Sequence, residues 1–118
     1  MTMATSQTES QPSTQDVLDS LASAADAARQ VYMAALVANP AADLSDLYRA
    51  EMKAAAIWAA AEDKALSNDP TIPAAQAKLD AATQGIRSEL GTLKDVSTWL
   101  TLVNGLVQLA ATVAKFFV

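Results

Sequence analysis

The sequence predicts an all-α protein: an antiparallel helical hairpin followed by a long C-terminal helix, continuous or broken, in a three- or four-helix bundle. Alanine, the strongest helix former, is the commonest residue, whereas aromatic residues make up 5% of the chain and Gly occurs 3 times. Apolar residues recur every three or four positions, the spacing of amphipathic helices. Asn39-Pro40 and Asp69-Pro70 divide these stretches, because the residue before proline is pushed out of the α region.

A chain of 118 residues can form one domain with a modest core. Residues 1–14 are rich in Ser, Thr and Gln and carry Glu9 as their only charge, so we expect a flexible polar tail. Residues 15–118 then form a single helical domain, with helices at about 15–38, 44–67, 72–95 and 97–117. The tail lacks the basic and apolar regions of a classical signal peptide, which favours a cytoplasmic location or export by a signal-peptide-independent route.

The first predicted helix starts at an approximate capping box formed by Ser13 and Asp16, and it ends before Asn39. Its apolar residues are spaced alternately by four and three positions, which is typical of a bundle seam. They are Val17, Leu21, Ala24, Ala28, Val31, Ala35 and Ala38.

The second predicted helix is capped by Asp43, has Asp46 in its first turn, and ends before Asp69-Pro70. Its apolar stripe consists of Leu47, Ala54, Trp58, Ala61 and Ala65. Alanines around one large aromatic residue favour close helix packing over a ligand site. The short connection between the two helices predicts an antiparallel hairpin.

Beyond Pro73 no further proline interrupts the apolar spacing. One unbroken helix would be about 69 Å long, roughly twice the length of each earlier helix, so those helices could not cover it. We expect a break near Gly91 or at residues 95–98, where Asp95, Ser97 and Thr98 can cap a fourth helix. With such a break the chain could close into a four-helix bundle.

Residues 99–118 carry a single charge, Lys115, and their polar positions fall within an arc of about 100° on a helical wheel. The apolar remainder needs cover, which favours contact with a second copy of the chain or with a helical protein partner. The expected interface residues are Trp99, Leu100, Val103, Asn104, Leu106, Val107, Gln108, Ala110, Val113, Phe116 and Phe117. Asn104 and Gln108 would fix the register of that interface or face water.

The same segment has the length of a bilayer span, with Trp99 suited to the membrane interface and Lys115 able to snorkel. The alternative function is therefore a pore-forming or membrane-anchored helical protein. A third possibility is a bundle whose fourth helix is covered internally.

Catalytic chemistry has little support in the sequence. The chain has no Cys, which excludes thiolate nucleophiles, and no His, the most frequent general acid or base, and these two residues are the usual zinc and transition-metal ligands. Its 8 basic residues are scattered and the net charge is −5, which argues against nucleic acid as a partner. We expect no enzyme activity, no catalytic residue, no cofactor or metal site and no small-molecule substrate.

The segment Asp69-Pro70-Thr71-Ile72-Pro73 is followed by a predicted helix from Lys78-Leu79 to Leu93-Lys94-Asp95-Val96. Over about 45 residues this pattern resembles the P-x-x-P hairpin and C-terminal helix of type III secretion needle subunits. Those subunits are shorter, lack a counterpart of the first helix and end before residues 99–118. The resemblance is thus an analogy for self-assembly without membership. It implies a secreted subunit of a secretion apparatus as the second alternative to a non-enzymatic helical interaction or structural protein.

Overall fold

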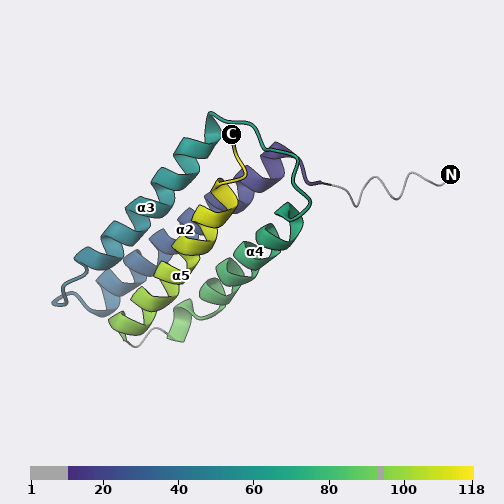
Figure 1. Ribbon diagram of the computed structural model, residues 1–118. Helices are drawn as coiled ribbons and strands as arrows, with labels where there is room; N and C mark the ends of the chain where they lie inside the picture. Colours follow the sequence, from purple (N-terminus) through teal and green to yellow (C-terminus); the bar gives the residue numbers. More distant parts are fainter. Residues whose placement is uncertain (1–10, 93–94) are drawn as a thin grey trace.

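The computed structural model describes residues 11–92 and 95–118 (Figure 1). The described part consists of α2 (Thr14–Ala38), α3 (Ser45–Glu62), α4 (Ile72–Ser88), the short 3-10 helix η1 (Leu90–Thr92) and α5 (Val96–Ala114). The all-α prediction is confirmed, and among the three- and four-helix alternatives the described residues form four α-helices.

The first helix begins as predicted. Ser13 is the N-cap of α2, and its side-chain oxygen accepts a hydrogen bond of 3.0 Å from the backbone N–H of Asp16. The helix ends at Ala38, where the N–H of Asn39 still donates to the carbonyl of Ala35 at 2.8 Å. Both boundaries follow the signals in the sequence, because the cap satisfies a free N–H and Pro40 prevents continuation.

The predicted end of the second helix at residue 67 is wrong, because α3 ends at Glu62. Residues 65–67 use their backbone groups in another contact: Ala65 exchanges hydrogen bonds of 3.2 and 2.9 Å with Val118, and the N–H of Ser67 donates to the carbonyl of Phe116 at 2.7 Å. These bonds replace helical ones. Asp69-Pro70 therefore does not terminate α3 and instead precedes α4.

The predicted break in the C-terminal half is present between Ser88 and Val96. Asp95 is the N-cap of α5, and its carboxylate accepts hydrogen bonds from the hydroxyls of Ser97 at 2.8 Å and Thr98 at 3.0 Å. The last helix is shorter than the predicted 97–117, since α5 ends at Ala114. Residues 116–118 leave the helix to pair with residues 65–67.

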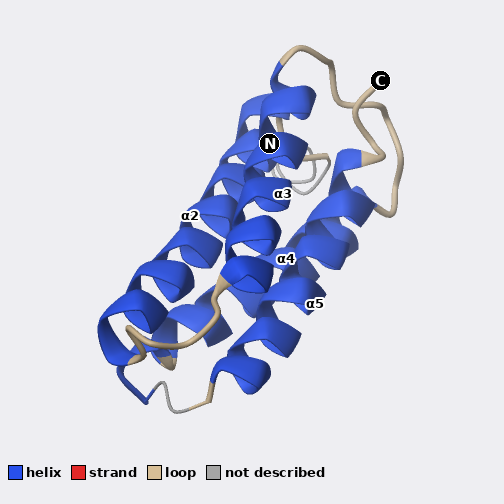
Figure 2. Ribbon diagram, turned by 90° about the vertical axis from the view of Figure 1, so that its left-hand side faces the viewer, coloured by secondary structure: helices blue, strands red, loops and turns tan. Residues whose placement is uncertain are grey.

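The four helices form a bundle in which α2 and α5 lie between α3 and α4 (Figures 1 and 2). The hairpin of α2 and α3 is antiparallel, as predicted, and so is the pair of α4 and α5. Because the connection between α3 and α4 crosses one end of the bundle, α4 runs parallel to α2, and α5 runs parallel to α3. Two interhelical surfaces therefore flank α5, one shared with α3 and one shared with α4.

The core is made largely of the predicted seams. All the predicted seam residues of α2 are buried except Ala38, and Leu47, Ala54 and Ala61 are buried on α3. Trp58 is only half-buried, and Ala65 is exposed because it lies beyond the end of α3. The large aromatic anchor of the core is instead Trp99 of α5, which is 3% exposed.

Polar contacts fix α4 against α2. The Arg87 guanidinium donates to the hydroxyl of Ser23 at 2.8 Å, to the carbonyl of Ser23 at 3.2 Å and to the carboxylate of Asp26 at 3.1 Å. Buried Ser20 accepts a bond of 3.0 Å from the side-chain amide of Gln76, and buried Thr83 donates to the carbonyl of Leu79 at 2.9 Å. The buried hydroxyls of Ser20 and Thr83 therefore both have a hydrogen-bond partner.

One end of the bundle is held by backbone pairing between chain segments, and we call it the closed end. It comprises residues 11–14, 65–67 and 116–118. The side chain of Gln11 donates to the carbonyl of Ser67, and the N–H of Leu66 donates to the hydroxyl of Thr14 at 3.4 Å. Residues 11–14 are thus part of the bundle, contrary to the predicted tail, and residues 1–10 of that tail lie outside the described residues.

Candidate functional site

Most of the predicted interface residues lie inside the bundle. Seven of them are at most 5% exposed: Trp99, Val103, Leu106, Val107, Ala110, Val113 and Phe117. The rest of the chain covers these seven side chains, because the break before Val96 turns α5 back against α2, α3 and α4. Contact between these seven and another molecule would require the bundle to open.

The other predicted interface residues lie nearer the surface. Leu100 and Phe116 are half-buried, whereas Asn104 and Gln108 are exposed on the outward side of α5. The polar residues Thr101, Thr112 and Lys115 are exposed as well. The polar arc read from the sequence therefore faces outward, which is the water-facing alternative for the two amides.

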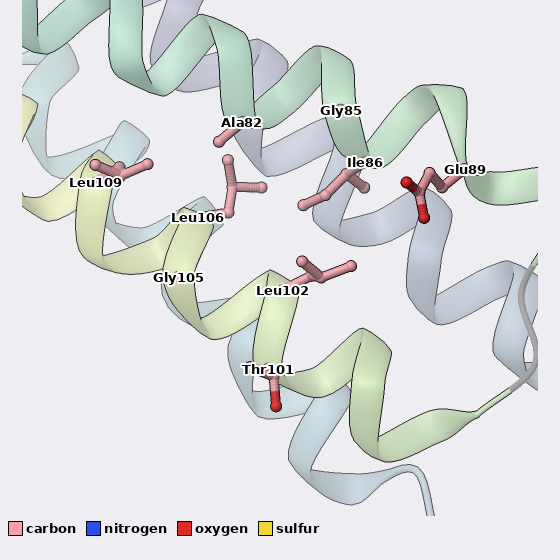
Figure 3. A pocket seen from close by; sticks show the side chains of 9 residues that line it. All are labelled: Ala82, Gly85, Ile86, Glu89, Thr101, Leu102, Gly105, Leu106 and Leu109. Atoms are coloured by element: carbon pink, nitrogen blue, oxygen red, sulfur yellow. The ribbon is translucent and has the colours of Figure 1, made fainter.

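A groove with a volume of about 340 Å³ lies between α4 and α5. Figure 3 shows Ala82, Ile86 and Leu106 at the groove, whereas Thr101 points away from α4. Gly85 and Gly105 face this space, and a Cβ atom added to either would meet nothing within 4 Å. The groove is open because both glycines lack side chains, and Glu89 is the only ionisable residue that lines it within the described part of the chain.

The other flank of α5 differs in chemistry. Two hollows of about 370 and 350 Å³ lie along the surface shared by α3 and α5. Arg49 and Lys53 line the first hollow, and Lys64 and Lys115 line the second. We call the two hollows together the cationic groove. Folding thus gathers basic residues that are scattered in the sequence.

The exposed apolar surface lies mainly on the hairpin. Five of the seven large apolar side chains exposed in the described part are on α2 and α3, and we call them the hairpin patch: Met33 (49%), Leu36 (40%), Val37 (83%), Tyr48 (47%) and Met52 (49%). Tyr32 connects the two helices, since its ring centroid lies 5.5 Å from that of Tyr48. Tyrosine and methionine are enriched in protein interfaces.

Three aspartates at helix starts have perturbed acidity. The pKa of Asp43 is lowered from its ordinary value by hydrogen bonds from the hydroxyl and then the backbone N–H of Ser45. Thr71 lowers the pKa of Asp69 in the same way. The hydroxyls of Ser97 and Thr98 lower the pKa of Asp95. The helix-start hydrogen bonds explain these shifts, so the carboxylates need no catalytic role.

A metal centre finds no support in the described residues, since no group of three acidic side chains there could hold an ion. One described helix, Val96–Ala114, is long and apolar enough to cross a membrane, with a mean hydropathy of 1.4. One third of that window is buried within the bundle.

Comparison of the chain with models of known protein families, with curated proteins and with solved structures finds no match. The functional argument therefore rests on the surfaces described above.

Sequence reasoning missed both the hairpin patch and the cationic groove. Met33 and Val37 are one turn apart, and so are Tyr48 and Met52, so the patch had a signal in the sequence. The cationic groove had none, because it forms only where α3 and α5 lie side by side.

Proposed function

We propose that this chain is a non-enzymatic helical protein that self-associates, and that the hairpin patch is the surface where two copies meet. The observation that carries the proposal is the concentration of exposed large apolar side chains on one hairpin. Exposed apolar side chains that gather on one surface favour a protein–protein contact there. The predicted interface on α5 moves to α2 and α3 in this proposal, since the apolar side of α5 is internal.

Charges beside the patch support a second copy as the occupant. Arg29 lies one turn before Met33, and Glu51 is adjacent to Met52. Both line a hollow of about 300 Å³ together with Asp26. A two-fold interface places each surface against its own copy, so a border that carries both signs can pair with itself. The absence of His and Cys from the chain supports a role without catalysis.

The test is the oligomeric state of the full chain in sedimentation velocity and light scattering. The unmodified protein should be a dimer or a larger oligomer at micromolar concentration. Met33→Lys with Val37→Lys should give a monomer, because two charges would be desolvated in the contact. Leu102→Lys is the matched control, since Leu102 is 40% exposed but lies on the α4–α5 groove. A monomeric unmodified protein, or a double variant that still associates, would overturn the proposal.

A membrane-active protein is the second candidate, favoured by the length and hydropathy of α5. Insertion would require α5 to leave the bundle and expose the sites it covers on α2 and α3. Dye-filled vesicles with anionic and neutral lipids test this candidate. Leakage that Leu102→Lys abolishes would support it, because a charge within the apolar part of a span opposes insertion. No leakage and no vesicle binding at any composition would remove it.

A further inference from the structure

The charges of this chain are segregated by the fold. The net charge is −5, yet four of the 8 basic residues line the cationic groove. Among the described residues, Asp46 is the only acidic residue that lines either hollow. A positive groove on an acidic protein attracts anionic partners to one place and repels them elsewhere. This groove lies on α3 and α5, and it shares α3 with the hairpin patch, because Tyr48 and Met52 of the patch precede Arg49 and Lys53 in the sequence.

The cations of the groove are mostly unneutralised by the chain itself. Arg49 forms an exposed ion pair of 2.8 Å with Asp46. Within residues 11–92 and 95–118, Lys53, Lys64 and Lys115 form no ion pair. Lys64 and Lys115 follow the ends of α3 and α5, where a helix dipole favours cations. Arg49 lies in the second turn of α3 and Lys53 lies near its middle, so the helix dipole does not explain the whole set.

The spacing of the cations defines what could lie in the groove. Arg49 and Lys53 form one pair a single turn apart, and Lys64 and Lys115 form a second pair at the other hollow. Lys53 and Lys64 are eleven residues apart on or just beyond α3, which corresponds to about 16 Å. The surface beside the second pair is lined by small side chains, including Ala60, Ala111 and Ala114. Small residues allow a helix backbone to approach closely.

We propose that an acidic α-helix of a partner protein lies in the cationic groove. Its carboxylates would pair with Arg49 and Lys53 at one end and with Lys64 and Lys115 at the other. Small side chains between the carboxylates would lie on the alanines. Charge-assisted hydrogen bonds then fix the register, and the alanine contacts supply apolar burial.

The acidic face of α2 in a second copy fits the groove less well. Asp19 and Asp26 lie on one face of α2 but are only about 10 Å apart, which is shorter than the separation of the two cation pairs. Asp26 is also engaged by Arg87 at 3.1 Å. Duplex DNA presents a charge about every 1.7 Å, so a nucleic acid would extend beyond four cations onto an acidic surface.

A labelled peptide probe tests this assignment on the full chain. The probe is an alanine-based helix of about 18 residues with two Glu pairs eleven residues apart, and its control peptide has Gln in place of every Glu. Binding is measured by fluorescence anisotropy at low and at physiological salt. Lys53→Glu with Lys64→Glu should weaken binding of the acidic peptide by about tenfold or more, and added salt should weaken it for the unmodified chain.

The single variant Lys78→Glu is the control for charge reversal, because Lys78 is an exposed lysine on α4, outside the groove. It should change the affinity less than about twofold. Unchanged thermal melting of all variants shows that they fold. Equal loss in Lys78→Glu, or equal binding of the Gln peptide, would overturn the proposal.

Two further measurements distinguish an acidic helix in the groove from a nucleic acid or a second copy of the chain. Tighter binding of a single-stranded oligonucleotide than of the acidic peptide, lost in the groove variant, would assign the groove to nucleic acid and overturn the proposal. Self-association that is lost in the groove variant but kept in Met33→Lys with Val37→Lys would assign it to a second copy and would also overturn the proposal. Self-association lost only in the latter variant, with peptide binding intact, supports both roles separately.

Discussion

The two ends of the bundle differ in how far their backbone groups are paired and their apolar side chains are buried. At the closed end, residues 65–67 and 116–118 exchange backbone hydrogen bonds, and Phe117 is buried with 4% exposure. At the opposite end, where Asn39–Leu44 connects α2 to α3, large side chains remain exposed, including Val37 at 83% and Tyr48 at 47%. The closed end has paired backbone groups and a buried aromatic side chain, as expected within a fold. The other end has exposed apolar side chains, as expected of a contact surface.

The difference shows where the surplus of apolar surface resides. The chain appeared to have that surplus on its last helix, but a break of a few residues between α4 and α5 is enough to bury it. No helix among the described residues covers Met33 and Val37, which remain exposed. The surface left for a partner is therefore set by topology more than by local hydrophobicity.

The largest expected effect is at the closed end. Phe117→Ala should lower the free energy of unfolding by about 3–5 kcal/mol, because it removes a buried aromatic side chain and leaves a cavity. Val118→Ala is the control, since Val118 is 77% exposed, and it should change stability by less than about 0.5 kcal/mol. Urea unfolding followed by circular dichroism measures both. Equal effects would show that the closed end contributes no packing energy.

The next effect concerns the backbone pairing itself. Ser67→Pro removes the N–H that donates to the carbonyl of Phe116 at 2.7 Å and should cost about 1–3 kcal/mol. Ser67→Ala keeps that N–H and should remain within about 0.5 kcal/mol of the unmodified chain. Hydrogen exchange of the Val118 amide reports the same contact, and it should become faster only in the proline variant. Unchanged exchange would mean that the pairing does not hold the segments together.

A smaller effect of opposite sign is expected in the α4–α5 groove. Gly85→Ala and Gly105→Ala should each raise stability by about 0.5–1 kcal/mol, because both glycines are helical and a Cβ atom would meet nothing within 4 Å. Gly91→Ala lies in the 3-10 helix and serves as the control, with a smaller expected gain. Thermal melts of the three variants decide the point. Destabilisation at Gly85 or Gly105 would show that the groove is narrower than described.

The fold followed from the sequence where a local signal acts alone. Ser13 with Asp16 gave the start of α2, and Asp95 with Ser97 and Thr98 gave the start of α5. Local signals did not predict the end of α3, because a long-range contact decides it: the backbone of Ala65 pairs with Val118 instead of extending the helix. The cover of α5 could not be predicted for a related reason: helical periodicity shows that one side is apolar, but it does not show which neighbour covers it.

The smallest expected effect is a pH dependence of the free energy of unfolding, which is compared between helix starts. Hydrogen bonds from Ser97 and Thr98 lower the pKa of Asp95 below its ordinary value of 3.8 in the folded state. The stabilisation from Asp95 is therefore complete above the unfolded pKa and is lost as the pH falls through the lower folded pKa. Ser97→Ala with Thr98→Ala removes the donors, so this variant should be less stable than the unmodified chain near neutral pH. The difference should shrink as the carboxylate protonates, in unfolding measured from about pH 6 to about pH 2.5.

Hydrogen bonds of the same kind lower the pKa of Asp43, which lies beside the turn between α2 and α3, and the pKa of Asp69, which lies beside the closed end. Ser45→Ala and Thr71→Ala therefore compare the two ends directly. A difference that grows on acidification in any of these variants would contradict the assigned hydrogen bonds, because protonation removes the charge that they stabilise.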